Sequence, residues 1–276
     1  MSSRLLLCTD MDRTIIPNGV QKELSTARQD LKTFCDRPEV TLVYVTGRHR
    51  ALVQEAIEEY QLPYPDYVIS DVGTKIYQTQ QDEWQVLDQW ESVIDQDWHG
   101  KTHQDLLETL TLLEGMELQE PSKQNTHKLS YYVSLSTNID RLLKEADSLL
   151  QAQKVDASLI WSIDEAENIG LLDILPKNAT KLHAIQFLQR FLNYSLEEVV
   201  FAGDSGNDLP VLTSEIHSVL VANASDDIKK QALHLAHANQ TTEALYLAQN
   251  QSGENGNYAA GVLQGVRHYI PTLQNI

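Results

Sequence analysis

Apolar runs and amphipathic stretches alternate near both ends of the chain. Short runs rich in Leu, Val and Ile are typical of strands, and apolar residues that repeat every three to four positions are typical of helices. The runs predict strands over 4–9, 40–45, 67–70, 170–175, 198–202 and 218–221. The repeats predict helices over 22–34, 50–60, 180–192, 226–238, 241–249 and 258–270. Strands that alternate with helices in this way indicate a parallel sheet covered by helices.

The middle of the chain departs from this alternation. All four tryptophans lie between residues 79 and 171, a stretch that carries 18 acidic side chains against 6 basic ones. Its pattern predicts helices over 102–113 and 138–152 and strands over 128–135 and 158–163. We therefore expect an α/β core, residues 1–78 and 172–276, interrupted by a separate α+β domain, residues 79–171. The polar stretch 249–257 is expected to form a mobile loop.

The charge balance of the chain argues against two classes of partner. Its 276 residues include 21 Lys and Arg against 39 Asp and Glu, for a formal net charge of −18. Binding to nucleic acid or to an anionic membrane relies on a basic surface, so neither partner is expected. Cys8 and Cys35 match no disulfide or zinc pattern, and no apolar run approaches the roughly 20 residues of a membrane span. We expect a soluble, cytoplasmic protein.

Two aspartates, Asp10 and Asp12, directly follow the first predicted strand. In a parallel α/β sheet, ligands bind beyond the carboxyl ends of the strands. Two carboxylates at such a place can act as a nucleophile and as a proton donor. The alternative is a turn with solvated aspartates.

Three further motifs lie at a strand end or at a helix start. Thr46-Gly47-Arg48 follows the second strand and offers a hydroxyl, a backbone N–H and a cation to a phosphate, although a capped turn explains the same residues. Lys181 lies near a predicted helix start, where its charge opposes the helix dipole. Asp204 and Asp208, in the loop GDSGND, suit a hard divalent cation such as Mg²⁺. Taken together, the motifs predict phosphoryl transfer.

The order of these motifs, DMDRT, VTGR, Lys181 and GDSGND, resembles that of the haloacid dehalogenase (HAD) superfamily of aspartate-nucleophile phosphatases. The insertion resembles the larger cap of its IIB branch. More narrowly, the chain resembles the sucrose-phosphate phosphatase family over nearly its whole length, in 64–67, 72–77, 128–131, 173–176 and 260–262. The resemblance implies a Rossmann-like parallel-sheet core with an inserted α+β cap domain of the C2 type. Arg13 departs from it, because a small residue is commoner there in the superfamily.

The resemblance also implies a role for each motif residue. Asp10 would attack phosphorus to form an aspartyl phosphate, while Asp12 would protonate the leaving oxygen and then activate water. Mg²⁺ would be held by Asp10, Asp204 and the main-chain carbonyl of Asp12, with Asp208 supporting it directly or through water. Oxygens of the phosphate would be held by Thr46, Gly47, Lys181 and Asn207.

Two further residues are candidates for contact with the substrate. Arg48 reaches the substrate or pairs with an acidic neighbour. Lys128, on a predicted strand of the insertion, contacts sugar or phosphate, or else is solvated.

The expected reaction is hydrolysis of a phosphorylated disaccharide or small sugar, with sucrose 6-phosphate giving sucrose and phosphate. The alternatives are a phosphatase for mannosylfructose phosphate or glucosylglycerol phosphate, a phosphomutase, and an inactive regulatory module that binds a sugar-phosphate synthase.

Overall fold

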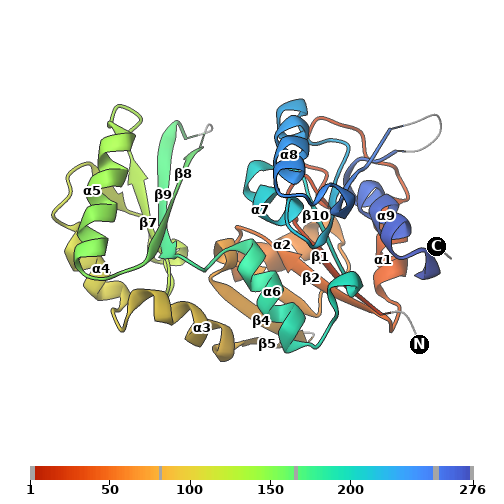
Figure 1. The fold of residues 1–276 in the computed structure, drawn as a ribbon, viewed down its shortest axis with the longest axis horizontal. Helices are drawn as coiled ribbons and strands as arrows, with labels where there is room; N and C mark the ends of the chain where they lie inside the picture. The colour runs from red at the N-terminus through yellow and green to blue at the C-terminus, as the bar shows by residue number, and fades with distance from the viewer. Residues whose placement is uncertain (1–3, 81–82, 165–166, 251–254, 274–276) are drawn as a thin grey trace. The chain divides into compact units, whose positions relative to one another are not determined.

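The computed structural model describes residues 4–80, 83–164, 167–250 and 255–273. The chain forms two compact units, one made of Met1–Val86 together with Lys181–Ile276, and the other of Leu87–Thr180 (Figure 1). Each unit has a sheet and a buried core of its own.

The first unit is built on an eight-stranded sheet in the order β12-β11-β10-β1-β2-β3-β4-β5. Its strands are β1 (Leu5–Thr9), β2 (Val40–Val45), β3 (Tyr67–Ser70), β4 (Lys75–Gln80), β5 (Glu83–Val86), β10 (Val199–Gly203), β11 (His217–Leu220) and β12 (Leu245–Leu247). From β12 to β3 all neighbours pair in parallel, while β4 and β5 add antiparallel strands at one edge. The central strands are almost completely buried, as expected for a parallel sheet that is covered on both faces.

Helices supply that cover. They are α1 (Ala27–Cys35), α2 (Arg50–Tyr60), α6 (Lys181–Phe191), α7 (Leu209–Leu212), α8 (Asp226–Ala238) and α9 (Tyr258–Tyr269). α1 and α9 contact each other, and both join α2 in one apolar cluster with alternate residues of β1 and β10. α6 contacts β3 and α7, and α7 contacts β10 and β11. None of the described side chains of α6 and α7 belongs to that cluster. The two helices therefore lie on the other face of the sheet.

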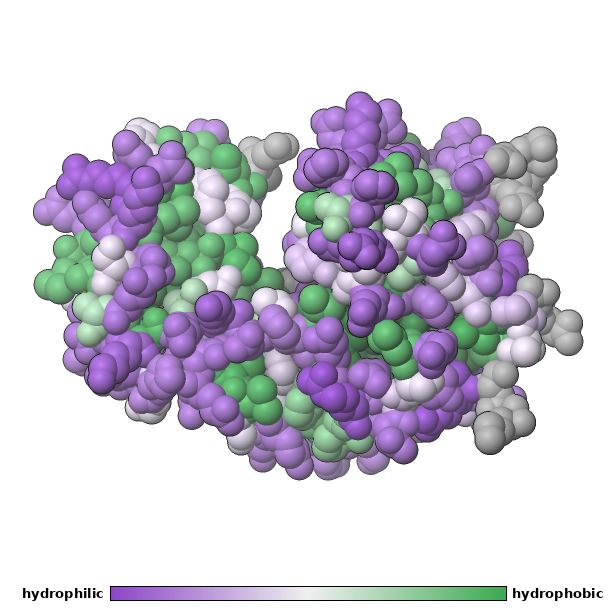
Figure 2. Space-filling view, in the orientation of Figure 1, coloured by the Kyte–Doolittle hydropathy of each residue, from purple (hydrophilic) through white to green (hydrophobic). Residues whose placement is uncertain are grey.

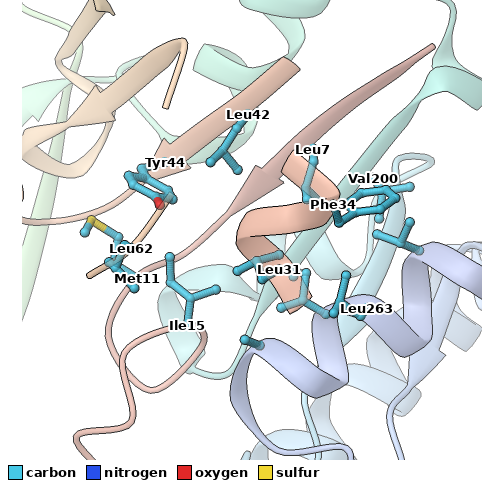
Figure 3. Close-up of a cluster of buried hydrophobic side chains, with 14 of the residues drawn as sticks. Leu7, Met11, Ile15, Leu31, Phe34, Leu42, Tyr44, Leu62, Val200 and Leu263 are labelled. Atoms are coloured by element: carbon cyan, nitrogen blue, oxygen red, sulfur yellow. The ribbon is translucent and has the colours of Figure 1, made fainter. Parts of the chain in front are cut away.

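The loop after β1 is anchored in the core by Met11 and Ile15. Both side chains are fully buried and belong to the cluster that holds Leu31, Phe34 and Leu263 (Figure 3). The Met11 carbonyl also accepts the backbone N–H groups of Thr14, Ile15 and Ile16 in a tight turn. Because Met11 lies between Asp10 and Asp12, its burial fixes the segment that carries both aspartates.

The second unit has an antiparallel sheet in the order β6-β7-β9-β8. Its elements are α3 (Asp88–Ile94), α4 (His103–Leu110), β6 (Met116–Leu118), β7 (Leu129–Val133), α5 (Ile139–Ala152), β8 (Ala157–Asp164) and β9 (Ile169–Pro176). A capping box of Thr102 and Asp105 starts α4, and the Asn138 side chain caps α5. Apolar residues of both helices pack with Trp98 against the sheet.

One predicted element is wrong, and another is a strand of the other unit. The stretch 170–175 is a strand, as predicted, but it was expected in the core, whereas β9 pairs with β7 and β8 in the second unit. The stretch 241–249 was expected to be a helix, but it contains β12, which pairs with β11 at the edge of the main sheet. Pairing with a neighbouring strand outweighs local helix propensity in such a short segment.

The predicted limits of the inserted domain, 79 and 171, also differ from the structure. The inserted unit begins at Leu87, because β5 pairs with β4 in the main sheet. It ends at Thr180, because β9 belongs to the sheet of the inserted unit. Helix α1 begins at Ala27 instead of residue 22.

The surface shown in Figure 2 is mainly hydrophilic, with smaller hydrophobic areas between. None of the helices in the described residues combines the length and the apolar composition that crossing a membrane requires. Of the predicted loop 249–257, residues 251–254 lie outside the described residues.

Candidate active site

Loops at the carboxyl ends of three adjacent strands, β10, β1 and β2, gather the predicted motif residues. Parallel strands end at the same edge of their sheet, so side chains far apart in the sequence meet there. The loop after β1 carries Asp10 and Asp12, the loop after β2 carries Thr46-Gly47-Arg48, and the loop after β10 carries residues 204–208. Lys181, the first residue of α6, joins them.

Three buried carboxylates form the centre of the site. Oxygens of Asp10, Asp204 and Asp208 lie within 4.8 Å of one another. Lys181 is 4% exposed, and its Nζ lies 2.7 Å from Asp10 Oδ1 and 2.7 Å from Asp208 Oδ1. The side-chain oxygen of Asn207 is 3.4 Å from the same Nζ. One ammonium therefore bridges two of the three carboxylates.

The Asp208 carboxylate organises the loop after β10. Its Oδ2 accepts hydrogen bonds from the backbone N–H groups of Asp204 and Ser205, both at 3.1 Å. A Cβ at Gly203 would lie 2.6 Å from the Asp208 carboxyl carbon, so a glycine is required where β10 ends. Asp208 therefore accepts hydrogen bonds from Lys181 through Oδ1 and from the loop backbone through Oδ2.

The carboxylate cluster is short of positive charge. Burial raises the pKa of Asp10 to about 7, and repulsion from Asp208 adds to this although Lys181 opposes it. Burial, with repulsion from Asp208, raises the pKa of Asp204 to about 6. Lys181 stays charged, because the charges of Asp10 and Asp208 outweigh its own burial and raise its pKa.

This donor set fits a hard divalent cation. Three carboxylates face two paired cations, Lys181 and Arg13, which leaves room for further positive charge. The available ligand atoms are all oxygens, the donors that Mg²⁺ prefers. Asp10, Asp204 and Asp208 are therefore the side chains that can hold Mg²⁺.

Asp12 has a different environment from Asp10. It is paired with Arg48, whose Nε donates to Oδ2 at 2.8 Å and whose Nη2 donates to Oδ1 at 2.7 Å. Asn18 donates a third hydrogen bond to Oδ1 at 2.8 Å. Partial burial alone would raise the pKa of Asp12, but the Arg48 guanidinium outweighs it, so the pKa is lowered. The pKa of Asp10 is therefore raised above the ordinary value, and the pKa of Asp12 is lowered below it.

The loop after β2 presents an exposed glycine beside a buried threonine. Thr46 is 1% exposed, and its Oγ1 accepts the backbone N–H of Arg48 at 3.1 Å. Gly47, next to it, is exposed. We call Thr46-Gly47-Arg48 the phosphate corner. Arg48 takes the second of its two predicted roles, since it pairs with Asp12, and it also lines the cleft.

A cleft of about 530 Å³ opens over these groups. Seven of its lining residues were predicted from the sequence as site residues: Asp10, Asp12, Thr46, Gly47, Arg48, Asp204 and Asn207. Sequence reasoning missed Leu52, Ser225 and Ile228, which lie on α2 and at the start of α8. Those residues carry no motif, so only the packing of α2 and α8 brings them to the cleft.

Arg13 also lines the cleft and contacts the carboxylate cluster. Its Nε lies 3.1 Å from Asp204 Oδ2, and its backbone has a left-handed conformation with φ 58°. Asn18 accepts its N–H and Asn223 donates to its carbonyl. The residue that departs from the superfamily pattern thus pairs with a predicted metal ligand.

Lys128 lies in the other unit, just before β7. It is 7% exposed, and its Nζ is 4.0 Å from Asp173 Oδ1. The Asp173 carboxylate also accepts the hydroxyl of Ser130. Lys128 is therefore buried and paired inside the inserted unit, which is contrary to the solvated alternative.

Comparison with known proteins shows the family to which the chain belongs. The sucrose-6F-phosphate phosphohydrolase family matches residues 3–270. The chain belongs to this family. A "Putative HAD-like hydrolase" of Nitrosococcus oceani is 46% identical over 98% of this chain and 73% of its own length. The mannosylfructose-phosphate phosphatase of Agrobacterium fabrum is 29% identical over 96% of each chain.

The fold of this family member matches that of a solved sucrose-phosphatase. The Synechocystis enzyme, solved in complex with sucrose and phosphate, superposes with a TM-score of 0.71 over 97% of this chain and 98% of its own, at 23% identity. This shows the HAD fold, with its parallel-dominated sheet and a second sheet. The chain spans about three fifths of the length of the tobacco sucrose-phosphatases that it matches, 59% and 60%.

Proposed function

We propose that this protein is a Mg²⁺-dependent phosphatase that hydrolyses a phosphorylated disaccharide, with sucrose 6-phosphate as the leading substrate. The observation that carries the proposal is the contrast between two aspartates on one loop, Asp10 beside Lys181 and Asp12 beside Arg48. Membership of the sucrose-6F-phosphate phosphohydrolase family supports the same reaction.

In the first half of the reaction, a carboxylate oxygen of Asp10 bonds to phosphorus, and the bond from phosphorus to the sugar oxygen breaks. The departing oxygen takes a proton from Asp12. Lys181, 2.7 Å from Asp10, and the phosphate corner offset the repulsion between the carboxylate and the phosphate. Bound Mg²⁺ on Asp10, Asp204, Asp208 and the Asp12 carbonyl would supply further positive charge to the phosphate oxygens.

In the second half, Asp12 takes a proton from water, the water oxygen bonds to phosphorus, and the bond from phosphorus to the Asp10 oxygen breaks. Inorganic phosphate leaves and Asp10 is regenerated. The lowered pKa of Asp12 suits this base step, because Arg48 holds the carboxylate ionised. The earlier acid step needs a protonated Asp12, so the contact with Arg48 must change within the cycle.

The substrate assignment is tested by a phosphate-release screen. The substrates are sucrose 6-phosphate, mannosylfructose phosphate, glucosylglycerol phosphate and simple hexose phosphates, each with Mg²⁺ and with a chelator. We expect the highest kcat/KM on sucrose 6-phosphate and no release with the chelator. A higher value on mannosylfructose phosphate would instead assign the reaction named for the Agrobacterium fabrum relative, which matches over 96% of its length.

The same screen separates the other hypotheses. A phosphomutase would form an isomer of the sugar phosphate without release of phosphate. A regulatory module would turn over none of the substrates, so any Mg²⁺-dependent release that depends on Asp10 removes that hypothesis.

A further inference from the structure

The turn Asp71–Gly73, between β3 and β4, holds three consecutive residues with positive φ. The values are 50° for Asp71, 61° for Val72 and 99° for Gly73. Glycine adopts this conformation without strain and aspartate tolerates it, but for a β-branched residue it is a real outlier. Val72 is the β-branched member of the positive-φ residues in the described part of the chain. The turn therefore contains a strained residue where glycine or asparagine would fit more easily.

The turn is fastened to the phosphate corner by two backbone hydrogen bonds. Val72 N–H donates to the carbonyl of Thr46 at 3.2 Å, and Asp71 N–H donates to the carbonyl of Arg48 at 3.1 Å. These two carbonyls flank Gly47. Val72 Cγ2 also lies 3.9 Å from the place where a Cβ on Gly47 would be. The turn thus holds the exposed glycine from both sides and packs a methyl group beside it.

The turn is itself well supported. Asp71 is 6% exposed, and its carboxylate accepts the Ser70 hydroxyl at 3.0 Å. Thr74 donates its N–H and its hydroxyl to the Asp71 carbonyl. The turn also contacts α6, the helix that begins with Lys181. It therefore touches two of the elements that carry phosphate-binding candidates.

We propose that Val72 is a positioning residue, which holds Gly47 in place for the oxygens of the substrate phosphate. A β-branched residue has only a narrow range of allowed φ and ψ in the left-handed region. The backbone N–H groups of Asp71 and Val72 are therefore held in nearly fixed positions. Strain of this kind persists at sites where the surrounding structure imposes it and function uses it. The inference rests on the proposed function, because the phosphate corner is part of that proposal.

The test replaces Val72 with residues that accept a left-handed conformation and retain the N–H, in the variants Val72→Gly and Val72→Asn. Gln240→Gly is the matched control, because Gln240 has the same φ of 61° and is exposed outside the cleft lining. Each protein is measured for KM and kcat on the substrate that the screen identifies. Calorimetry gives the Kd of inorganic phosphate with Mg²⁺, and a thermal melt gives Tm.

We expect both Val72 variants to raise KM and the phosphate Kd about fivefold or more, with kcat changed by less than about twofold, because the reacting aspartates are untouched. Gln240→Gly should leave KM, kcat and the phosphate Kd unchanged. If glycine at position 72 prevents folding, Val72→Asn decides the question.

Two results would overturn the inference and differ in what they say of the proposed function. Wild-type protein that binds phosphate, with both variants binding it equally well, would remove the role of Val72 and leave the phosphatase proposal intact. Wild-type protein that neither binds phosphate nor releases it from any sugar phosphate would remove both.

Discussion

Arg48 holds both oxygens of the Asp12 carboxylate, through Nε at 2.8 Å and Nη2 at 2.7 Å. This fork-to-fork pair joins the loop after β1 to the loop after β2, and its geometry is one that lysine cannot reproduce. It leaves Asp12 charged, while burial raises the pKa of Asp10, two residues earlier, to about 7. The pair therefore keeps Asp12 in the ionised form that the second half of the proposed reaction needs.

Replacing Arg48 with glutamine should raise the pKa of Asp12, because burial then acts without the opposing guanidinium. A carbon-13 NMR titration of the Asp12 carboxyl measures this pKa directly. We expect kcat to fall on the order of tenfold, since the charge state of the acid–base group is disturbed. Arg141→Gln, which breaks an exposed pair with Glu145, is the control and should change neither quantity. An unchanged Asp12 titration would refute the assigned role of Arg48.

The Asp10→Asn variant should lose phosphate release by a factor on the order of 10⁴ or more, because an amide does not attack phosphorus. Its circular dichroism and its melting should stay close to those of the wild type. Asp140→Asn, at an exposed position of α5, is the control with full activity. A variant at position 10 that keeps substantial activity would exclude Asp10 as the nucleophile.

Lys181→Met should destabilise the metal-free protein by about 3 kcal/mol, because it leaves buried carboxylates without their partner. The loss should be larger at pH 8 than at pH 5, where a carboxyl with a raised pKa is already protonated. Urea unfolding at both pH values measures this, with the exposed Lys177→Met as control. Equal stability of the Lys181 variant and the wild type would contradict the buried ion pairs.

Metal-free protein should lose stability as the pH rises from about 4 to about 7. A carboxyl whose pKa is raised on folding is protonated more readily in the folded state, so stability falls between its unfolded and folded pKa values. Folded values of about 7 for Asp10 and about 6 for Asp204 define that range. Mg²⁺ should bind more tightly as the pH rises through the same range and should release protons, which calorimetry in two buffers detects. A pH-independent Mg²⁺ affinity would exclude these carboxylates as ligands.

In the main sheet, local patterns predicted β1, β2, β3, β10 and β11, but not β4, β5 or β12. β2, α2, β3 and α8 have the predicted bounds, because their apolar periodicity is strong and is bordered by polar residues. β12 could not be predicted in this way, since Leu245–Leu247 is too short to carry a period and is a strand only because β11 lies beside it. The assignment of β9 failed for a related reason: its sequence indicates a strand but not which sheet it joins.

The candidate site shows the same division. Asp10, Asp12, Asp204, Asp208 and Lys181 were predicted from motifs at strand and helix ends. The structure brings the side chains of Asp10, Asp204, Asp208 and Lys181 together and places Asp12 in the lining of the same cleft as Asp10. The sequence did not show which carboxylate pairs with Arg13, or that α8 helps to form the cleft. It left open whether Arg48 pairs with an acidic neighbour, which the structure identifies as Asp12. Long side chains have many rotamers, and the nearest charge selects among them only in the folded protein.

The sequence by itself determined the parallel core, the presence of an insertion and the order of the chemical groups. These depend on periodicity and on residues close together in the chain. Only the tertiary structure decided where the insertion begins and ends, which cation pairs with which carboxylate, and that the turn with the strained Val72 is hydrogen-bonded to the loop after β2. Those features arise from contacts between segments that are distant in sequence, where strand pairing, burial and charge act together and local propensity carries no information.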